Sequence, residues 1–160
     1  MGNVKTISDV IEMYLCELLS RSDDGMIEVQ RSELSELFSC VPSQINYVIA
    51  TRFTPPRGYL VESKRGGGGY IRIRRIASQH INEISQLLRA VGDSIAQKEA
   101  EGIIWRLESD SVLSQREASL LRVAVSRDTL LLPLPDRDIL RARLLSLMLA
   151  TVYGYRSNDS

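Results

Sequence analysis

The stretch that decides the fold is Lys64-Arg-Gly-Gly-Gly-Gly-Tyr-Ile-Arg-Ile-Arg-Arg75. The strict alternation from Ile71 to Arg74 predicts a strand with one apolar and one cationic face. Glycine tolerates a positive φ and leaves no side chain in the way, so the run Gly66–Gly69 predicts the tip of a β-hairpin. We therefore expect two strands, 59–63 and 70–76, joined by this glycine tip.

The residues before the hairpin predict a helix-turn-helix. Residues 32–38 form a short apolar-faced segment, 39–42 supply the turn, and Pro42 suits the first position of a new helix. In the helix expected over 43–52, Ile45, Val48 and Ile49 share one stripe. The polar residues left on the outside are Gln44, Asn46, Tyr47 and Thr51.

Two further elements precede this motif. A helix is expected to begin near Ser8, with Ser8 as its N-cap, and 26–30 reads as a short strand. The order helix, strand, helix, turn, helix and hairpin is that of a winged helix-turn-helix, which has a common use in entering DNA grooves.

The charge distribution supports this interpretation although the net charge is zero. Residues 1–51 carry three Lys and Arg against eight Asp and Glu, and residues 76–160 carry ten against eleven. Residues 52–75 carry seven Lys and Arg against Glu62 alone. The positive charge is thus concentrated in one stretch, as a phosphate-facing surface requires.

From Ala77 onward the pattern is purely helical. We expect one long helix through Ile95, a polar end or turn over 97–102, a short helix after it, and a helix opened by the capping box of Ser114 and Glu117. The last helix, starting after Leu134-Pro-Asp136, is apolar on most of its circumference, so a partner subunit is the simplest cover. The tail 155–160 is expected to be disordered.

These observations predict a mainly α (α+β) protein. The domains expected are a winged helix-turn-helix DNA-binding domain over 1–76 and an all-α helical dimerisation domain over 77–154. Composition, with 44% hydrophobic and 25% charged residues, fits a soluble globular chain. No apolar run is long enough for a bilayer, and no signal peptide is evident, so a cytoplasmic protein without membrane contact is expected.

No catalytic constellation is evident in the sequence. Cys16, Cys40 and His80 cannot complete a four-ligand zinc site without carboxylates, and paired carboxylates such as Asp136 and Asp138 fall where helix caps explain them. We expect no enzyme activity, metal or cofactor.

The residues expected to contact DNA lie on the second helix of the motif and on the hairpin. Gln and Asn side chains can pair with adenine edges in the major groove, whereas a glycine-tipped cationic loop suits the minor groove. Arg52 shares the apolar stripe and is expected to reach a phosphate rather than a base. The full set is Ser43, Gln44, Asn46, Tyr47, Thr51, Arg52, Lys64, Arg65, Gly66, Gly67, Gly68, Gly69, Tyr70, Arg72 and Arg74.

The motifs at 41–49, 51–55 and 58–73 closely resemble the CtsR family, repressors of class three stress genes in Gram-positive bacteria. The likeness covers nearly the whole chain. It implies a homodimer that binds tandem operator repeats in double-stranded DNA before Clp protease and chaperone genes, and release on heat through the glycine-rich wing. It further implies a protein arginine kinase and a Clp ATPase/protease as partners. Arg65 matches the wing arginine associated with phosphorylation and DNA contact.

Two other functions remain open at the level of sequence. A winged helix can grip a protein instead of DNA, and a helical half can hold a small-molecule effector. No polar cluster that would form an effector pocket is apparent in the sequence.

Overall fold

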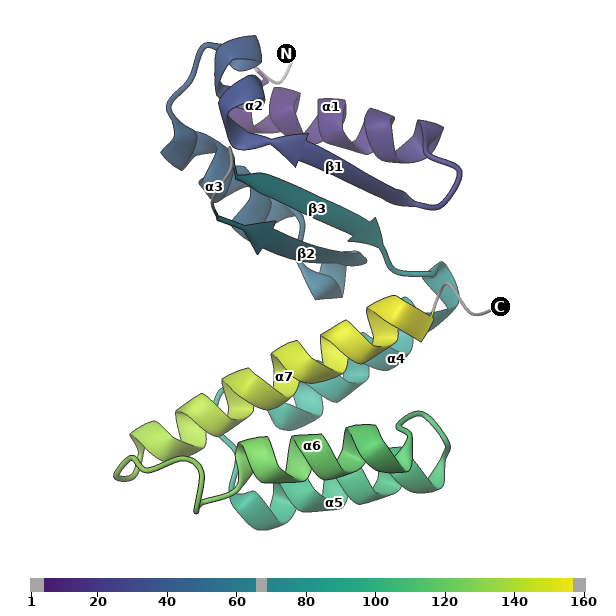
Figure 1. Ribbon diagram of the computed structural model, residues 1–160, viewed down its shortest axis with the longest axis vertical. Coiled ribbons are helices and arrows are strands. Elements are labelled where there is room, and N and C mark those ends of the chain that lie inside the picture. Colours follow the sequence, from purple (N-terminus) through teal and green to yellow (C-terminus); the bar gives the residue numbers. More distant parts are fainter. Residues whose placement is uncertain (1–4, 66–68, 157–160) are drawn as a thin grey trace. The chain divides into compact units, whose positions relative to one another are not determined.

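The computed structural model describes residues 5–65 and 69–156, and the chain divides into two compact units. One unit contains the residues up to Ile81 together with Arg156, and the other contains Asn82–Tyr155. Most of the described chain is helical, with one small sheet (Figure 1). This confirms the expected fold class. None of the helices in the described ranges has the length and apolarity that a bilayer crossing needs.

The N-terminal unit has the element order of a winged helix-turn-helix. Its elements are α1 (Ile7–Arg21), β1 (Met26–Gln30), α2 (Arg31–Phe38), α3 (Pro42–Arg52), the 3-10 helix η1 (Pro55–Arg57), β2 (Tyr59–Lys64) and β3 (Tyr70–Arg75). The sheet is antiparallel in the order β1-β3-β2, with Ile71 opposite Val29 and Ile73 opposite Val61. The predicted strands and the two helices of the motif are confirmed.

One apolar core joins the helices of this unit to the sheet. The buried side chains come from α1, α2, α3, the residue that follows α3, and β3. They are Ile11, Leu15, Leu19, Leu34, Ile45, Val48, Ile49, Phe53, Ile71 and Ile73. The alternation in β3 therefore places its isoleucines on the helix-covered face, as predicted. Burying the helices against this sheet fixes α3 relative to the hairpin.

The first helix begins earlier than predicted. Thr6, rather than Ser8, is the N-cap: its side chain accepts a hydrogen bond from the backbone N–H of Asp9, and the Asp9 carboxylate accepts one from the backbone N–H of Thr6. These bonds lower the pKa of Asp9 from its ordinary value, with the backbone bond of Thr6 as the largest cause. The Thr6–Asp9 spacing is that of a capping box, so the pair outcompetes Ser8, which lies inside the helix.

The turn between α2 and α3 follows the chemistry expected of it. Ser39 adopts a left-handed conformation (φ 48°) that ends α2, and its N–H donates to the carbonyl of Glu36. Pro42 occupies the start of α3, where its missing N–H is not needed.

The C-terminal unit is an all-helical bundle whose boundaries differ from those predicted. Its helices are α4 (Ser78–Val91, which starts in the N-terminal unit), α5 (Gln97–Ser109), α6 (Gln115–Val125) and α7 (Asp136–Arg156). The expected helix through Ile95 is wrong, because Gly92 (φ +69°) ends α4. Ile95 is buried but not helical, and its position four residues after Val91 matches the helical spacing on which the prediction rested.

Two other expectations in this unit need correction. Residues 97–102 are neither a polar end nor a turn; they form the first half of a continuous α5. Tyr155 and Arg156 belong to α7, so the expected tail is wrong for these two residues, and 157–160 lie outside the described residues. The capping box that opens α6 at Ser114 and Glu117 is confirmed.

Candidate nucleic-acid interface

The outer face of α3 carries most of the polar residues that the sequence placed there. Ser43, Asn46 and Thr51 are exposed, and 56% of the Tyr47 surface is accessible. The Thr51 hydroxyl donates to the carbonyl of Tyr47 over 2.7 Å, one turn back along the helix. A ligand that approaches this face would meet an amide, a phenol and two hydroxyls.

Gln44 does not lie on the outside as the sequence predicts. It is half-buried, and its Nε2 donates to the Ser8 hydroxyl of α1 over 2.8 Å. Bidentate pairing with adenine needs both the amide nitrogen and the amide oxygen. Gln44 in this conformation ties α3 to α1 instead.

Arg52 is engaged within the fold, whereas the sequence suggested a reach toward phosphate. Its Nη1 lies 2.8 Å from a Glu12 carboxylate oxygen and 3.2 Å from one of Asp9, both on α1. The Arg57 guanidinium also approaches Glu12, at 3.7 Å. The acidic face of α1 therefore neutralises the cationic end of α3.

The hairpin carries exposed cations at the edge of its tip. Lys64 and Arg65 are exposed, and Gly66, Gly67 and Gly68 lie outside the described residues. Gly69 has φ +56°, as expected of a glycine in the turn. The Lys64 amine lies 5.9 Å from the centre of the Tyr70 ring, a cation–π distance that orients the lysine at the base of the tip.

Arg72 of β3 is paired with carboxylates of both neighbouring strands. Arg72 contacts Glu28 of β1 at 2.6 Å and Glu62 of β2 at 3.6 Å, and its guanidinium lies 5.6 Å from the Tyr70 ring centre. The hydrogen bond to Glu28 is the largest cause that raises the pKa of Arg72 above its ordinary value. Arg74 lies two residues further along β3, on the same face of the strand as Arg72, and its Nη2 lies 3.4 Å from the Met26 sulfur.

Arg31 is a residue of this surface that the sequence reasoning missed. At the start of α2, its Nε donates to the Asn46 Oδ1 of α3 over 2.8 Å. Its Nη2 donates to the Ser63 hydroxyl of β2 over 2.9 Å. Its Nη1 lies close to Gly69, since a Cβ added to that glycine would be 3.8 Å from this nitrogen. Arg31 thus joins α3 to the hairpin beside its tip. No local sequence pattern signals this, since its partners are 15 and 32 residues away.

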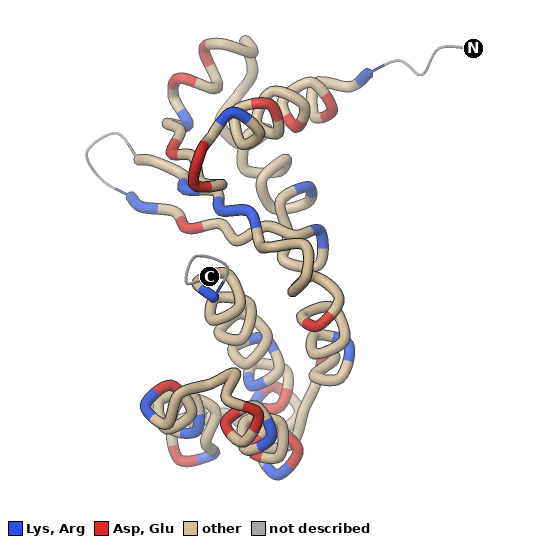
Figure 2. The backbone as a smooth tube through the Cα atoms, turned by 90° about the vertical axis from the view of Figure 1, so that its right-hand side faces the viewer, with Lys and Arg blue, Asp and Glu red and all other residues tan. Residues whose placement is uncertain are grey.

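Positive charge remains available on one part of this unit. Within the described ranges, no carboxylate forms an ion pair with Arg31, Lys64 or Arg65. Figure 2 shows the cationic backbone segment of β2 leading directly into the hairpin tip. The geometry thus places an exposed polar helix face beside a cationic hairpin.

Two family models match the chain and together span most of it. The CtsR N-terminal HTH domain matches residues 6–77, and the CtsR C-terminal dimerization domain matches residues 79–150.

Curated relatives agree with these matches. The chain is 50% identical to the transcriptional regulator CtsR of Geobacillus stearothermophilus and 46% identical to that of Bacillus subtilis. Each alignment covers 91% of this chain and 96% of the relative. A structure described as CtsR in complex with a 26bp DNA duplex is 50% identical over 92% of this chain and 99% of that one, with a TM-score of 0.49.

Proposed function

We propose that this chain, which belongs to the CtsR family of transcriptional regulators, is a homodimeric repressor that binds operator DNA. In this proposal α3 enters the major groove and the glycine-tipped hairpin enters the minor groove. Residues 1–76 form the DNA-binding domain and 77–154 the dimerisation domain. The observation that carries the proposal is the Arg31 bridge, which holds the exposed face of α3 beside an unneutralised cationic hairpin.

The two elements have different tasks in this proposal. Asn46, Tyr47, Ser43 and Thr51 face the base edges or the adjacent phosphates from α3. The Asn46 amide oxygen accepts from Arg31, so its Nδ2 is the group that is left to donate to a base or a phosphate. Lys64 and Arg65 carry the positive charge into a narrow minor groove, where the negative potential is strongest. Arg52, Arg72 and Gln44 support this surface through the contacts that they make within the fold.

The biological role follows from the family resemblance. We propose that the operators are tandem repeats before genes of Clp proteases and other stress genes, and that heat or stress releases the repressor. Phosphorylation of Arg65 by an arginine kinase is proposed as one route of release. It would replace an exposed cation by a group with net negative charge beside the DNA backbone.

The salt dependence of binding tests the proposal directly. Arg31, Lys64 and Arg65 supply three cations per protomer and six per dimer. At about −0.9 per neutralised phosphate, log K should fall against log[salt] with a slope on the order of −5. Fluorescence anisotropy of a labelled operator duplex at several salt concentrations measures this slope.

The same measurement separates the leading alternative. A winged helix that grips a protein through an apolar groove would show almost no such slope with its partner, and no retention of any duplex at low salt. A flat response with every duplex would reject DNA binding.

A second prediction concerns the bridge itself. Arg31→Gln removes both the link to Asn46 and the link to Ser63, so these two side chains lose the guanidinium that holds the exposed face of α3 to the hairpin, while the apolar core still packs α3 on the sheet. At ~1.5 kcal/mol for a charged hydrogen bond, we expect operator binding to weaken about tenfold or more per protomer. Arg21→Gln is the control, because Arg21 is exposed and pairs with Glu17 on α1. Equal affinity of the Arg31 and Arg21 variants would contradict a positioning role.

A further inference from the structure

A polar pocket in the C-terminal unit gathers positive charge that neither DNA binding nor the helical core uses. The cavity measures about 470 Å³ and lies where the start of α5, the loop after α6 and the start of α7 meet. Its lining residues are Ala96, Gln97, Lys98, Glu101, Arg127, Asp128, Leu134, Arg137, Asp138 and Arg141. No local sequence pattern indicates this pocket, because its residues come from three separate segments.

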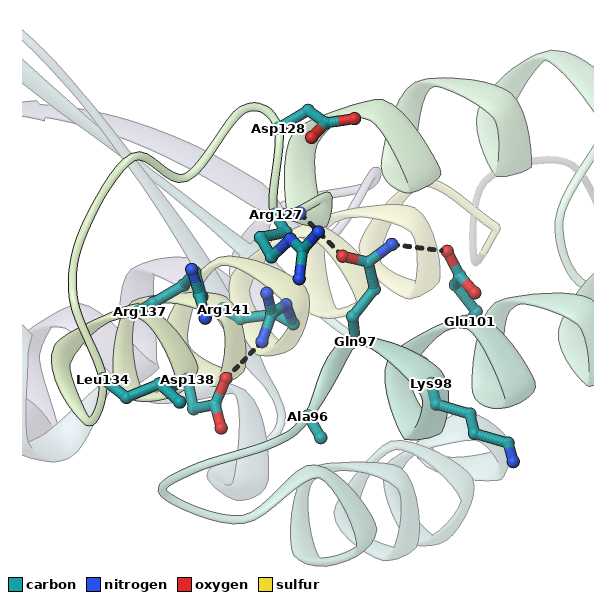
Figure 3. Close-up of a pocket in the computed structure, with 10 residues that line it drawn as sticks. All are labelled: Ala96, Gln97, Lys98, Glu101, Arg127, Asp128, Leu134, Arg137, Asp138 and Arg141. Carbon is teal, nitrogen blue, oxygen red and sulfur yellow. Dashed lines mark hydrogen bonds and ion pairs between the residues drawn. The ribbon is translucent and has the colours of Figure 1, made fainter.

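Three guanidinium groups share this pocket. Figure 3 shows the side chains of Arg127, Arg137 and Arg141 gathered together, whereas Lys98 and Asp128 extend away from them in this view. Among the described residues, no carboxylate or carbonyl accepts a hydrogen bond from the side chain of Arg127 or Arg137. Guanidinium groups repel one another, so a shared pocket of this kind favours a bound anion.

Arg141 anchors the cluster from inside the protein. Only 1% of its surface is exposed. Its Nε donates to the carbonyl of Val125 over 2.7 Å, and its Nη1 donates to the carbonyl of Ile95 over 3.0 Å and to the Asp138 carboxylate. Its Nη2 donates to no described residue, and Arg141 is among the residues that line the pocket.

The lining carries four cationic side chains, Lys98 and the three arginines, against the three carboxylates of Glu101, Asp128 and Asp138, so its formal net charge is positive by one. Asp138 is occupied by Arg141, and Glu101 accepts a hydrogen bond from Gln97 over 3.0 Å. The start of α5 adds to the positive potential, because its N-cap is Ala96, which offers no side-chain cap to the first N–H groups of the helix.

We propose that this pocket binds a phosphoryl group carried by a small molecule, free phosphate being the simplest case. A phosphate has three or four oxygens directed tetrahedrally, so it can accept hydrogen bonds from Arg127 of the loop after α6 and from Arg137 and Arg141 of α7 at the same time. A carboxylate has two oxygens in one plane and would leave part of the cluster unpaired. A ligand held here would join α5, α7 and the loop between α6 and α7, and the site stands independently of the proposed operator contacts.

The test is the thermal stability of the full-length protein in inorganic phosphate and in pyrophosphate, at constant ionic strength set with chloride. A ligand that binds only the folded state raises Tm with its concentration. We expect both anions to raise Tm in the wild type. In the double variant Arg127→Gln/Arg137→Gln the anions should bind roughly ten- to a hundredfold more weakly, as the loss of charged hydrogen bonds predicts.

Controls separate this site from the cationic hairpin. Arg143→Gln removes an exposed arginine of α7 outside the pocket and should leave the response to phosphate unchanged. Arg65→Gln should also leave it unchanged, although it weakens operator binding. The proposal is overturned if neither anion raises Tm in the wild type, or if the double variant, folded as judged by circular dichroism, responds as the wild type does.

Discussion

Replacing Arg65 by Glu is expected to weaken operator binding by roughly 10²- to 10⁴-fold. Hydrogen bonds to charged groups contribute about 1.5–3 kcal/mol each, and a homodimer loses one such contact at each of two hairpins. Arg65 is exposed, and within residues 5–65 and 69–156 no carboxylate pairs with it. Its replacement therefore removes the proposed DNA contact without disturbing the fold, and it places an anion where phosphorylation would place one.

Anisotropy titrations of a labelled operator with the wild type and the variant measure this effect. Arg75→Glu is the matched control, because Arg75 is an exposed arginine at the opposite end of the same hairpin, paired in register with Tyr59. We expect the control to bind within a few-fold of the wild type at moderate salt. If the two variants lose the same affinity, net charge rather than a contact of Arg65 controls binding. An unchanged affinity of the Arg65 variant would remove Arg65 from the interface.

Replacing Arg141 by Met is expected to lower the free energy of unfolding of the C-terminal unit by about 3–5 kcal/mol. Methionine approximates the length of the arginine side chain but donates no hydrogen bond. The carbonyls of Val125 and Ile95 lose their buried donor, and Asp138 loses its ion-pair partner. The side chain of Asp138 is itself only 26% exposed, so water replaces the guanidinium incompletely.

Urea denaturation followed by tryptophan fluorescence measures this loss, because Trp105 is the single tryptophan and lies in α5 of the same unit. Protein concentration must be the same for all variants, since dimerisation contributes to the apparent stability. Arg143→Met is the control: it changes an exposed arginine two positions along α7 and should shift the stability by no more than about 0.5 kcal/mol. Similar stabilities of the two variants would show that the buried hydrogen bonds of Arg141 are replaced by other contacts.

Both predictions concern arginines whose roles the sequence alone treats very differently. Arg65 directly precedes the glycine run that predicts a hairpin tip, and its exposed side chain agrees with that prediction. Arg141 looks like one of several charges on a helix with an apolar circumference. Its burial emerges only when α6 and the segment before α5 close over it.

The sequence determined the elements whose formation depends on neighbouring residues. Alternation in β3, the proline at the start of α3 and the capping box of Ser114 and Glu117 each act within a few residues, and each was predictable. Where two local signals competed, as with Thr6 and Ser8, the better hydrogen-bond spacing prevailed. The apolar period continues to Ile95, but α4 ends at Gly92, whose positive φ terminates the helix. Ile95 is buried outside any helix, so the apolar period alone does not give the end of α4.

Only the tertiary structure decided which polar side chains are free to meet a ligand. Arg72 and Glu28 are 44 residues apart, and Gln44 and Ser8 are 36 apart, yet each pair forms a hydrogen bond. Such pairs depend on which faces of α1, α3 and the sheet the apolar core brings together. The positions of charged and polar residues in the sequence do not indicate that packing. The sequence therefore located the cationic hairpin. Packing determined that Lys64 and Arg65 of the hairpin, and Arg31 of α2 beside it, have no carboxylate partner among the described residues, and it brought the arginines of the pocket together.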